Sequence, residues 1–368
     1  MKFFPQYRPS FVILGVLISL IGIGIIMIYS ASSIYAEKQL GNEFYFLTRQ
    51  LIHLVVGLVF FRIAIKFHYL KYKQYIPILM FVTFVLLILV LIPGIGKQVG
   101  NARRWIRIGG IGFQPSELLK ITLIIWAAGF LERKKRVLGY FSQGILPSLI
   151  VISCFCLLLI LQPDFGTSVL IAVTLLLMVF VAGGKTSHMV VSFVGLSTIG
   201  FWLIISKAYR MRRIMGFLDP WADPLDSGFQ LIQSMVAYGT GGLFGRNLGD
   251  SRQKLFFLPE SHTDFIFSIL AEETGFIGVS LVILLLVLLM IKGFEIAVTC
   301  PDDFGRNLAF GVTIILILQS FFNIGVVIGL LPTKGIPLPF ISYGGSSLIV
   351  SMFMVGILLN ISKYCIRR

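Results

Sequence analysis

Apolar runs that recur along the whole chain are the feature that most constrains its fold. Each run is close to the about 20 residues that an α-helix needs to cross about 30 Å of hydrocarbon. The chain of 368 residues is 57% hydrophobic and only 13% charged, which excludes an ordinary soluble domain. We therefore predict an all-α polytopic membrane protein with about ten transmembrane helices. The predicted spans are 10–30, 47–65, 75–92, 115–131, 144–161, 166–182, 188–206, 263–291, 308–330 and 346–361.

The chain is expected to form a single membrane domain over residues 1–368, because neither a change of composition nor a flexible linker divides it. The first run could be a signal peptide, since Ala31 and Ser33 resemble a cleavage site. Its core, from Phe11 to Ile28, is longer than the about 7–15 residues of a signal peptide's apolar region, so a retained helix is favoured. The one long polar stretch, about 207–262, is predicted to be an outer loop between helices 7 and 8.

Basic residues set the predicted orientation in the membrane. An even number of spans places both termini on one side, and the positive-inside rule makes that side cytoplasmic. The basic clusters on that side are Arg133 to Arg136, the trio Lys66, Lys71 and Lys73, and the tail with Lys363, Arg367 and Arg368. About half of the 31 Lys and Arg residues nevertheless fall on the outer side. A pyrophosphate-bearing lipid on the outer leaflet would explain them, and so would attraction to anionic headgroups.

Two short outer segments carry charged side chains. Between spans 3 and 4, Arg103 and Arg104 precede the sequence Phe-Gln-Pro-Ser-Glu-Leu-Leu-Lys. Proline suits the first turn of a helix, so a helix is predicted to begin there, with Glu117 and Lys120 as i,i+3 neighbours just below the surface. Spans 5 and 6 meet in a tight turn that places Asp164 at the outer rim.

Two longer outer segments follow. The loop after span 7 contains Arg210 and Arg213, and its Asp-Pro pairs favour turns. Within it, 228–244 has apolar residues at helical spacing and is predicted to lie flat in the interface or to re-enter the membrane partly. The segment 331–347, which contains Lys334, is too rich in Pro and Gly for a regular helix. Irregular backbone at that depth is tolerated only when it is buried in protein or lines a wet cavity.

The long polar loop ends on Pro-Glu-Ser-His-Thr-Asp-Phe, which places Glu260, His262 and Asp264 at the start of span 8. Ionisable groups at such a boundary are costly unless they are paired or hydrated, so they indicate a functional site. A structural role is an equal alternative for Asp264. The sequence from Ser261 to Asp264 matches a capping box, whose acid would hold a free backbone N–H.

Other interpretations of this cluster are less favoured. A metal site at His262 lacks a second His or Cys at ligand spacing. A catalytic triad is disfavoured because Ser261, His262 and Asp264 are too close in sequence to relay a proton along one line. Glu272 and Glu273 lie deeper in span 8, where pairing with a basic side chain inside the bundle is the favoured role.

Four motifs, in order along essentially the whole chain, resemble the family of shape, elongation, division and sporulation (SEDS) proteins. They are Gln-Pro-Ser-Glu-Leu, Gln-Pro-Asp-Phe-Gly-Thr-Ser, Leu-Pro-Glu-Ser-His-Thr-Asp-Phe-Ile-Phe and Ile-Ser-Tyr-Gly-Gly-Ser-Ser. Three further segments look more like the division branch of the family than the elongation branch. They are Phe217 to Pro224, Gln253 to Leu255, and Leu331 to Gly335.

The resemblance implies a ten-helix fold whose long outer loop covers the site, and a peptidoglycan glycosyltransferase in the bacterial cytoplasmic membrane. Its substrates would be lipid II and the growing glycan strand, joined on the outer face. The family's essential acid lies in the His-Thr-Asp motif, which is Asp264 here. A class B penicillin-binding protein would supply the transpeptidase, alongside other division or elongation membrane proteins, and no nucleic-acid partner is expected.

A mechanism follows as a hypothesis. The sugar 4-hydroxyl of an incoming lipid II attacks the anomeric carbon of the growing strand, Asp264 takes the proton, and undecaprenyl pyrophosphate leaves with inversion. Positive charge is needed where the charge of the leaving group develops, and a divalent cation, Mg²⁺ or Mn²⁺, could assist. The candidate substrate-binding residues are Arg103, Arg104, Glu117, Lys120, Arg210, Arg213, Lys254, Glu260, His262 and Lys334.

Two other functions compete with the transferase. A flippase carrying lipid II across the bilayer would use the same basic outer residues and intramembrane acids such as Glu272. Against it stand the lack of visible repeats and the concentration of polar residues on one side. A non-catalytic scaffold that recruits division partners would leave the costly outer acids unexplained.

Overall fold

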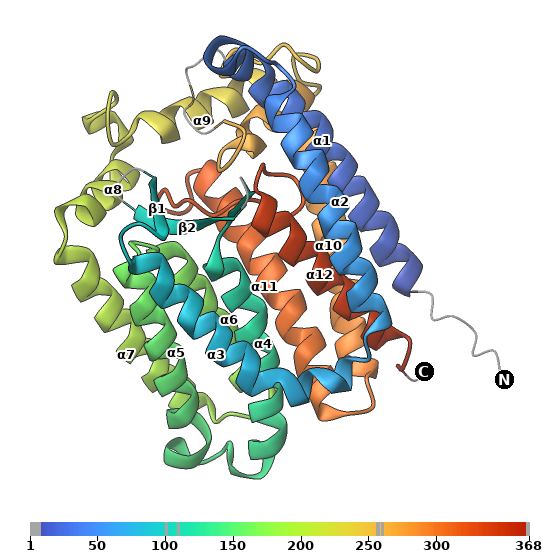
Figure 1. The fold of residues 1–368 in the computed structure, drawn as a ribbon. Coiled ribbons are helices and arrows are strands. Elements are labelled where there is room, and N and C mark those ends of the chain that lie inside the picture. The colour runs from blue at the N-terminus through green and yellow to red at the C-terminus, as the bar shows by residue number, and fades with distance from the viewer. Residues whose placement is uncertain (1–8, 100–101, 109–110, 255–257, 259–260, 366–368) are drawn as a thin grey trace.

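Long helices make up most of the structure, a computed structural model that describes residues 9–99, 102–108, 111–254, 258 and 261–365. Each predicted span overlaps one of these helices, because each apolar run satisfies its backbone hydrogen bonds internally. Figure 1 shows them side by side as one bundle. They are α1 (Pro9–Leu40), α2 (Tyr45–Lys66), α3 (Tyr72–Leu91), α4 (Pro115–Lys134), α5 (Leu146–Leu161), α6 (Phe165–Val181), α7 (Thr186–Ile205), α10 (Ile266–Thr299), α11 (Asp303–Val327) and α12 (Gly345–Ser362).

The helical membrane fold is confirmed by the lengths and composition of these helices. Of the described helices, eight are long and apolar enough to cross a membrane, and α6 is a shorter apolar helix. Helix α4 is less apolar because it carries Glu117 and Lys120 near one end and Arg133 and Lys134 at the other. It packs against α3 and α11, and Glu117 and Lys120 are buried within the protein, whereas Arg133 and Lys134 are exposed at its last turn.

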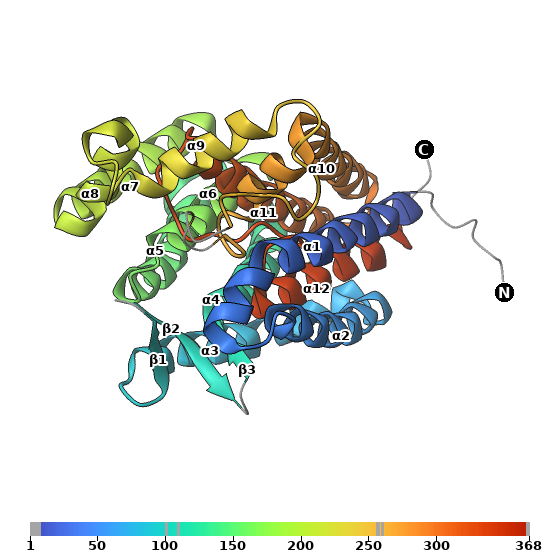
Figure 2. The same cartoon turned by 90° about the horizontal axis from the view of Figure 1, so that it is seen from above.

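Helix α12 forms the centre of the packing. It contacts α2, α11 and α4, and 89% of its most apolar stretch is buried. Figure 2 shows it enclosed by α1, α2 and α11 when the bundle is seen from above. A Cβ atom at Gly356 would lie 2.7 Å from the Cβ of Ala64, so the glycine permits close contact between α12 and α2. Small residues at such crossings strengthen helix packing in membranes.

A small antiparallel sheet lies between α3 and α4, and the all-α prediction did not include it. Its strands β1 (Gly96–Val99), β2 (Ala102–Ile108) and β3 (Ile111–Phe113) pair in the order β1-β2-β3. Arg103 pairs with Gln98 and Ile106 pairs with Gly96 across the two strands, and one extra residue of β2, between Arg103 and Trp105, interrupts the regular alternation of side chains. The Arg103 guanidinium donates to the Gln98 Oε1 atom at 3.5 Å.

The predicted outer loop folds into short elements that cross the bundle. Helices α8 (Ala208–Leu218) and α9 (Phe229–Gly241) are joined through the 3₁₀ turn η4 (Pro220–Ala222). The helix predicted within 228–244 is therefore confirmed as α9. Figures 1 and 2 show α9 lying across one end of the bundle, above α11. The loop covers the end of the bundle at which α6, α10 and α12 begin.

Helix α10 is broken at Gly275, whose φ of 64° and ψ of −163° are not helical. The segment from Gly242 to Arg246 fills the break. The Gly242 carbonyl accepts from the Phe276 N–H at 2.9 Å, and the Arg246 N–H donates to the Glu272 carbonyl at 3.0 Å. These bonds replace those that the break removes, so the outer loop is joined to α10 through backbone contacts.

Gly275→Ala is expected to destabilise the fold. This backbone region is essentially restricted to glycine and costs other residues about 1–3 kcal/mol. A new Cβ would also lie 2.3 Å from the Gly245 nitrogen. The thermal unfolding midpoint of the purified protein in detergent should therefore fall. Gly22→Ala is the control, because nothing lies within 4 Å of its new Cβ. An equal midpoint for the two variants would contradict the prediction.

Candidate active site

Asp264 lies in a turn directly before α10, partly exposed, and the capping-box interpretation is wrong. Helix α10 begins at Ile266, and its N-cap, Phe265, makes no side-chain cap bond within the described part of the chain. The Ser261 hydroxyl instead donates to the Ala31 carbonyl at 3.3 Å. The box would have required Ser261 to start the helix, but the chain makes one further turn after Ser261 before the helix starts. Asp264 is therefore not the cap residue of α10.

The Asp264 carboxylate lies against the segment 331–344. Its Oδ2 atom is 3.1 Å from the point where a Gly335 Cβ would stand, so a larger residue there would push the carboxylate away by a few tenths of an ångström. The neighbouring residue is Lys334, whose Nζ atom lies 5.5 Å from the centre of the Phe322 ring. The segment is irregular, as predicted. Its Lys334 directly precedes Gly335, the residue that the Asp264 carboxylate approaches.

Lys334 shares an aromatic ring with a cation from the outer loop. Its Nζ atom and the Arg210 guanidinium each lie 5.7 Å from the centre of the Phe165 ring. Arg213 reaches the same region, because its guanidinium donates to the Thr333 carbonyl at 3.2 Å. Burial lowers the pKa of Lys334 from its usual value. Three predicted cations therefore gather where α6 begins.

Arg104 is bound to the turn that precedes α6. Its Nε atom donates to the Gln162 carbonyl at 3.1 Å, and a second guanidinium nitrogen donates to the Pro163 carbonyl. Its guanidinium also lies 3.9 Å from the Asp164 carboxylate. Asp164 caps α6 by accepting from the Thr167 N–H. Arg104 thus shapes the turn, whereas the Arg103 side chain contacts Gln98 of β1.

Glu117 and Lys120 form a buried ion pair on α4, with the Lys120 Nζ atom 2.6 Å from the Glu117 carboxylate. Lys120 also donates to the Gln319 Oε1 atom on α11 at 2.7 Å. The i,i+3 pairing predicted from the sequence is confirmed. The pair lies deeper than the sequence analysis placed it, since both residues are at most 5% exposed.

Lys254, a predicted substrate-binding residue, is part of a buried cluster. Its Nζ atom lies 3.1 Å from the Glu273 carboxylate, 3.2 Å from the Ser30 Oγ atom and 2.5 Å from the Gly249 carbonyl. A buried cation requires a counter-ion, and Glu273 already neutralises this one. The predicted pairing of Glu273 with a basic side chain is confirmed. The cluster joins α1, the outer loop and α10.

Glu272 anchors the start of the segment that leads to Asp264. Its carboxylate accepts from the backbone N–H groups of Arg252 and Gln253 at 3.1 and 3.2 Å, and from the Ser251 hydroxyl. The Arg246 guanidinium lies 3.8 Å away, so this acid also pairs with a basic side chain, as predicted. Glu272 therefore holds outer-loop backbone and is buried within the protein.

His262 lies among aromatic rings. The centre of its imidazole is 4.4 Å from that of Phe46 and 5.8 Å from those of Tyr35 and Tyr343. Its carbonyl accepts from the Tyr343 N–H at 3.0 Å. Within the described part of the chain, no group of three or more His, Cys, Asp or Glu side chains is placed to hold a metal ion. Glu260 lies outside the described residues.

Two buried amides on α11 were missed by the sequence analysis. Asn323 donates to the Asp264 and Ile336 carbonyls, both at 2.8 Å. Gln319, one turn earlier, accepts from Lys120 and donates to the Pro337 carbonyl at 2.8 Å. The signal that could have found them is an i,i+4 pair of polar side chains inside an apolar run.

Comparison with known proteins gives the chain's relatives. Residues 11–366 match the family of cell cycle proteins described as FtsW, RodA and SpoVE. A probable peptidoglycan glycosyltransferase FtsW from Geobacter sp. (strain M18) is 47% identical over 340 residues, covering 92% of each chain. Stage V sporulation protein E from Bacillus subtilis (strain 168) is 44% identical over 358 residues, covering 97% of each chain.

Solved structures have the same fold. One is a chain described under the structural coordination of polymerization and crosslinking by a peptidoglycan synthase complex. It superposes with a TM-score of 0.78 at 30% identity, covering 95% of this chain and 96% of that chain. The rod shape determining protein RodA of Thermus thermophilus superposes with a TM-score of 0.70 at 28% identity, covering 97% of each chain.

Lys254→Met is expected to destabilise the protein strongly. It leaves the Glu273 carboxylate buried without its cation, and breaking a buried pair in this way costs about 3–5 kcal/mol. Adding Glu273→Gln removes the uncompensated charge and should recover most of the loss. Thermal unfolding in detergent measures both variants. A double variant no more stable than Lys254→Met would contradict the ion-pair explanation.

Proposed function

The chain belongs to the family of FtsW, RodA and SpoVE cell cycle proteins, and from this premise we propose that it is a peptidoglycan glycosyltransferase. It polymerises lipid II into glycan strands on the outer face of the cytoplasmic membrane. The observation that carries the proposal is the position of Asp264, whose carboxylate lies against Gly335 beside Lys334. The names of relatives at 44–47% identity over nearly the whole chain support it.

The reaction transfers the growing strand to an incoming lipid II. The 4-hydroxyl of the acceptor sugar attacks the anomeric carbon of the strand's terminal sugar, and the bond from that carbon to the pyrophosphate oxygen breaks with inversion. Asp264 takes the hydroxyl proton as the attack proceeds, and undecaprenyl pyrophosphate leaves with the bonding electrons. A general base of this kind contributes about 10²–10⁴-fold to the rate.

The leaving pyrophosphate requires cations already in place where its charge develops. Lys334, Arg210 and Arg213 meet this need, because they gather around the Phe165 ring and the Thr333 carbonyl. Arg104 and Lys254 are instead paired with the buried acids Asp164 and Glu273, and they stabilise the turn before α6 and the outer loop. Within the described residues no group of acidic side chains is placed to hold a metal ion, so a divalent cation, Mg²⁺ or Mn²⁺, would be bound through the phosphate oxygens and would add positive charge there, while Asp264 stays available as the base.

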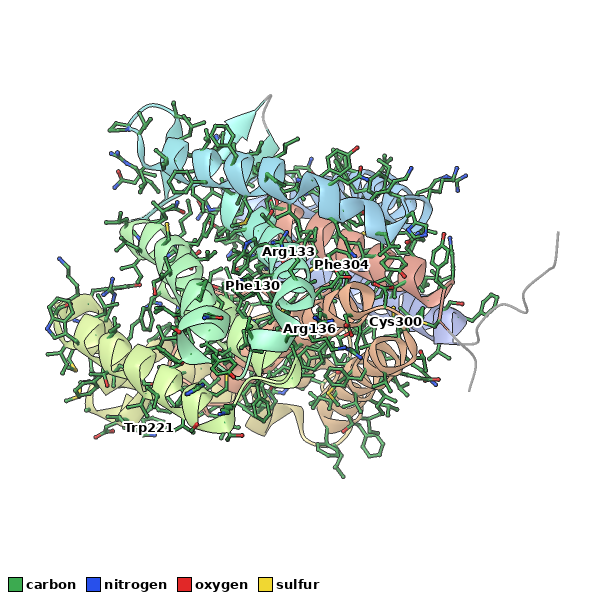
Figure 3. All side chains as sticks on the ribbon, turned by 90° about the horizontal axis from the view of Figure 1, so that it is seen from below. Phe130, Arg133, Arg136, Trp221, Cys300 and Phe304 are labelled. Atoms are coloured by element: carbon green, nitrogen blue, oxygen red, sulfur yellow. The ribbon has the colours of Figure 1, made fainter. Side chains whose placement is uncertain are left out.

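Both termini are proposed to be cytoplasmic, with the active site facing outward. Figure 1 shows the two ends of the chain on the side of the bundle opposite α9. Figure 3, seen from that side, shows Arg133 and Arg136 on the same face. Basic residues favour the cytoplasmic side, so this arrangement supports an outside position for Asp264 and the outer loop.

The polymerase is proposed to act in septal wall synthesis together with a class B penicillin-binding protein. Relatives named FtsW favour the division role over elongation. A solved relative described as a peptidoglycan synthase complex that coordinates polymerization with crosslinking supports a transpeptidase partner. The assays below therefore use this chain co-purified with its cognate class B penicillin-binding protein. Lipid II in detergent has no membrane to cross, so glycan formation there distinguishes a polymerase from a flippase or a scaffold.

Asp264→Asn should lower the rate of glycan formation by about 10²-fold or more, because the amide cannot accept the proton. Product chains made from lipid II in detergent give the rate, and the thermal unfolding midpoint checks folding. Asp226→Asn is the matched control, since this exposed outer-loop acid pairs only weakly with Arg212. Full polymerisation by a folded Asp264→Asn variant would exclude Asp264 as the base.

Lys334→Arg should extend activity to higher pH. Burial lowers the pKa of Lys334, so its ammonium loses charge at a lower pH than a free lysine does, and phosphate binding weakens as pH rises. Arginine stays charged throughout this range. Rates measured between about pH 7 and 10 should show a weaker alkaline decline in the variant. An unchanged alkaline limb would show that Lys334 charge does not limit the reaction.

A further inference from the structure

We infer that Gln319 and Asn323 of α11 are positioning residues, which hold the catalytic acid, the Lys334 segment and the Glu117–Lys120 pair in one geometry. The inference rests on the proposed function for the role of Asp264 and Lys334. Neither amide contacts the reacting atoms in the mechanism above. Each acts through groups that do, by bridging two elements that are distant in sequence.

The segment 331–344 makes only short-range hydrogen bonds of its own, such as those from the Ile341 and Ser342 N–H groups to the Leu338 carbonyl. It contains Pro332, Pro337 and Pro339, which have no backbone N–H and cannot take part in a regular ladder. Its residues Ile336 and Leu338 are nevertheless buried, at 4% and 1% exposure. Buried carbonyl oxygens in such a segment need donors from elsewhere in the protein.

Asn323 provides one of these donors and also donates a hydrogen bond to the backbone of Asp264. Its Nδ2 atom donates at 2.8 Å to the Ile336 carbonyl and at 2.8 Å to the Asp264 carbonyl. Both partners can only accept, so the amide nitrogen must face them. The side chain is only 2% exposed, which shields both bonds from water. Asn323 thus sets the separation of Asp264 from the segment that carries Lys334.

Gln319 makes the matching bridge on the adjoining turn. Its Nε2 atom donates to the Pro337 carbonyl at 2.8 Å, and its Oε1 atom accepts from Lys120 at 2.7 Å. Residues four apart lie on the same face of a helix, so the two amides can donate to the consecutive carbonyls of Ile336 and Pro337. Through Lys120, the buried acid Glu117 is tied to the same helix face.

Loss of either amide is therefore expected to displace reacting groups without removing any of them. A misplacement of about 1 Å in an active site can lower a rate by about 10²-fold. Asn323→Leu keeps a side chain of similar size but removes both donated bonds. Ser320→Ala is the matched control, because Ser320 is buried on the same helix and its hydroxyl bonds only to the Leu316 carbonyl of that helix.

The first experiment measures hydrogen–deuterium exchange and rate on the complex with the penicillin-binding protein. Asn323→Leu should raise exchange in peptides covering 261–268 and 331–344, and should lower kcat for lipid II by about 10- to 100-fold. Ser320→Ala should leave both as in the wild type. If Asn323→Leu matches Ser320→Ala in exchange and kcat, the inference is overturned. Because exchange needs no turnover, it decides the positioning role even if the wild type makes no glycan and the proposed function fails.

The second experiment separates positioning from general loss of stability. If Asn323 acts by placing the Lys334 segment, Lys334→Ala should lower kcat by a smaller factor in the Asn323→Leu background than in the wild type. Equal factors in the two backgrounds would indicate a merely structural role and overturn the inference. If Asn323→Leu does not fold, Gln319→Glu replaces it. That variant keeps the acceptor for Lys120 and removes the amide donor to the Pro337 carbonyl and, at 3.5 Å, to the Ser347 hydroxyl.

Discussion

The structure depends on one constraint: at membrane depth, every polar group must find its partner inside the protein. The break in α10 at Gly275 exists because the segment 242–246 supplies the replacement backbone bonds. The Glu273 carboxylate is tolerated because Lys254 and Ser30 reach it. The proline-rich segment beside Asp264 is tolerated because two amides of α11 take its carbonyls.

The same constraint divides the many cations of the outer face into two groups. Lys254 and Arg104 contact internal acids and carbonyls, and the resulting bonds fix the loop and the turn before α6. Lys334 and Arg210 lie over one aromatic ring, Phe165, and Arg210 also donates to the Leu203 carbonyl, so positive charge gathers where α6 begins. A polymerase of pyrophosphate-linked sugars needs both groups. Cations stabilise the leaving pyrophosphate best when the surrounding protein already holds them in position.

Sequence patterns predicted these features unevenly. The apolar runs predicted the long helices, and the ionisable groups of span 8 led to Asp264 and to the pairing of Glu273. The capping box was wrong because α10 begins at Ile266, after a turn whose His262 carbonyl accepts from the distant Tyr343 N–H and whose Ser261 hydroxyl donates to the Ala31 carbonyl. The sheet from 96 to 113 was missed because its strands are short and carry little alternation of apolar and polar residues.

The sequence by itself determined the class of protein, the approximate helix positions, the family resemblance and the acid at the start of α10. These follow from local composition and motifs, since a membrane helix satisfies its own backbone bonds. Only the tertiary structure decided which cations are free to meet a substrate. It also showed that Asn323 bridges Asp264 to a segment that follows α11. Such contacts join residues far apart along the chain, and hydrogen bonding between them depends on packing that no local pattern encodes.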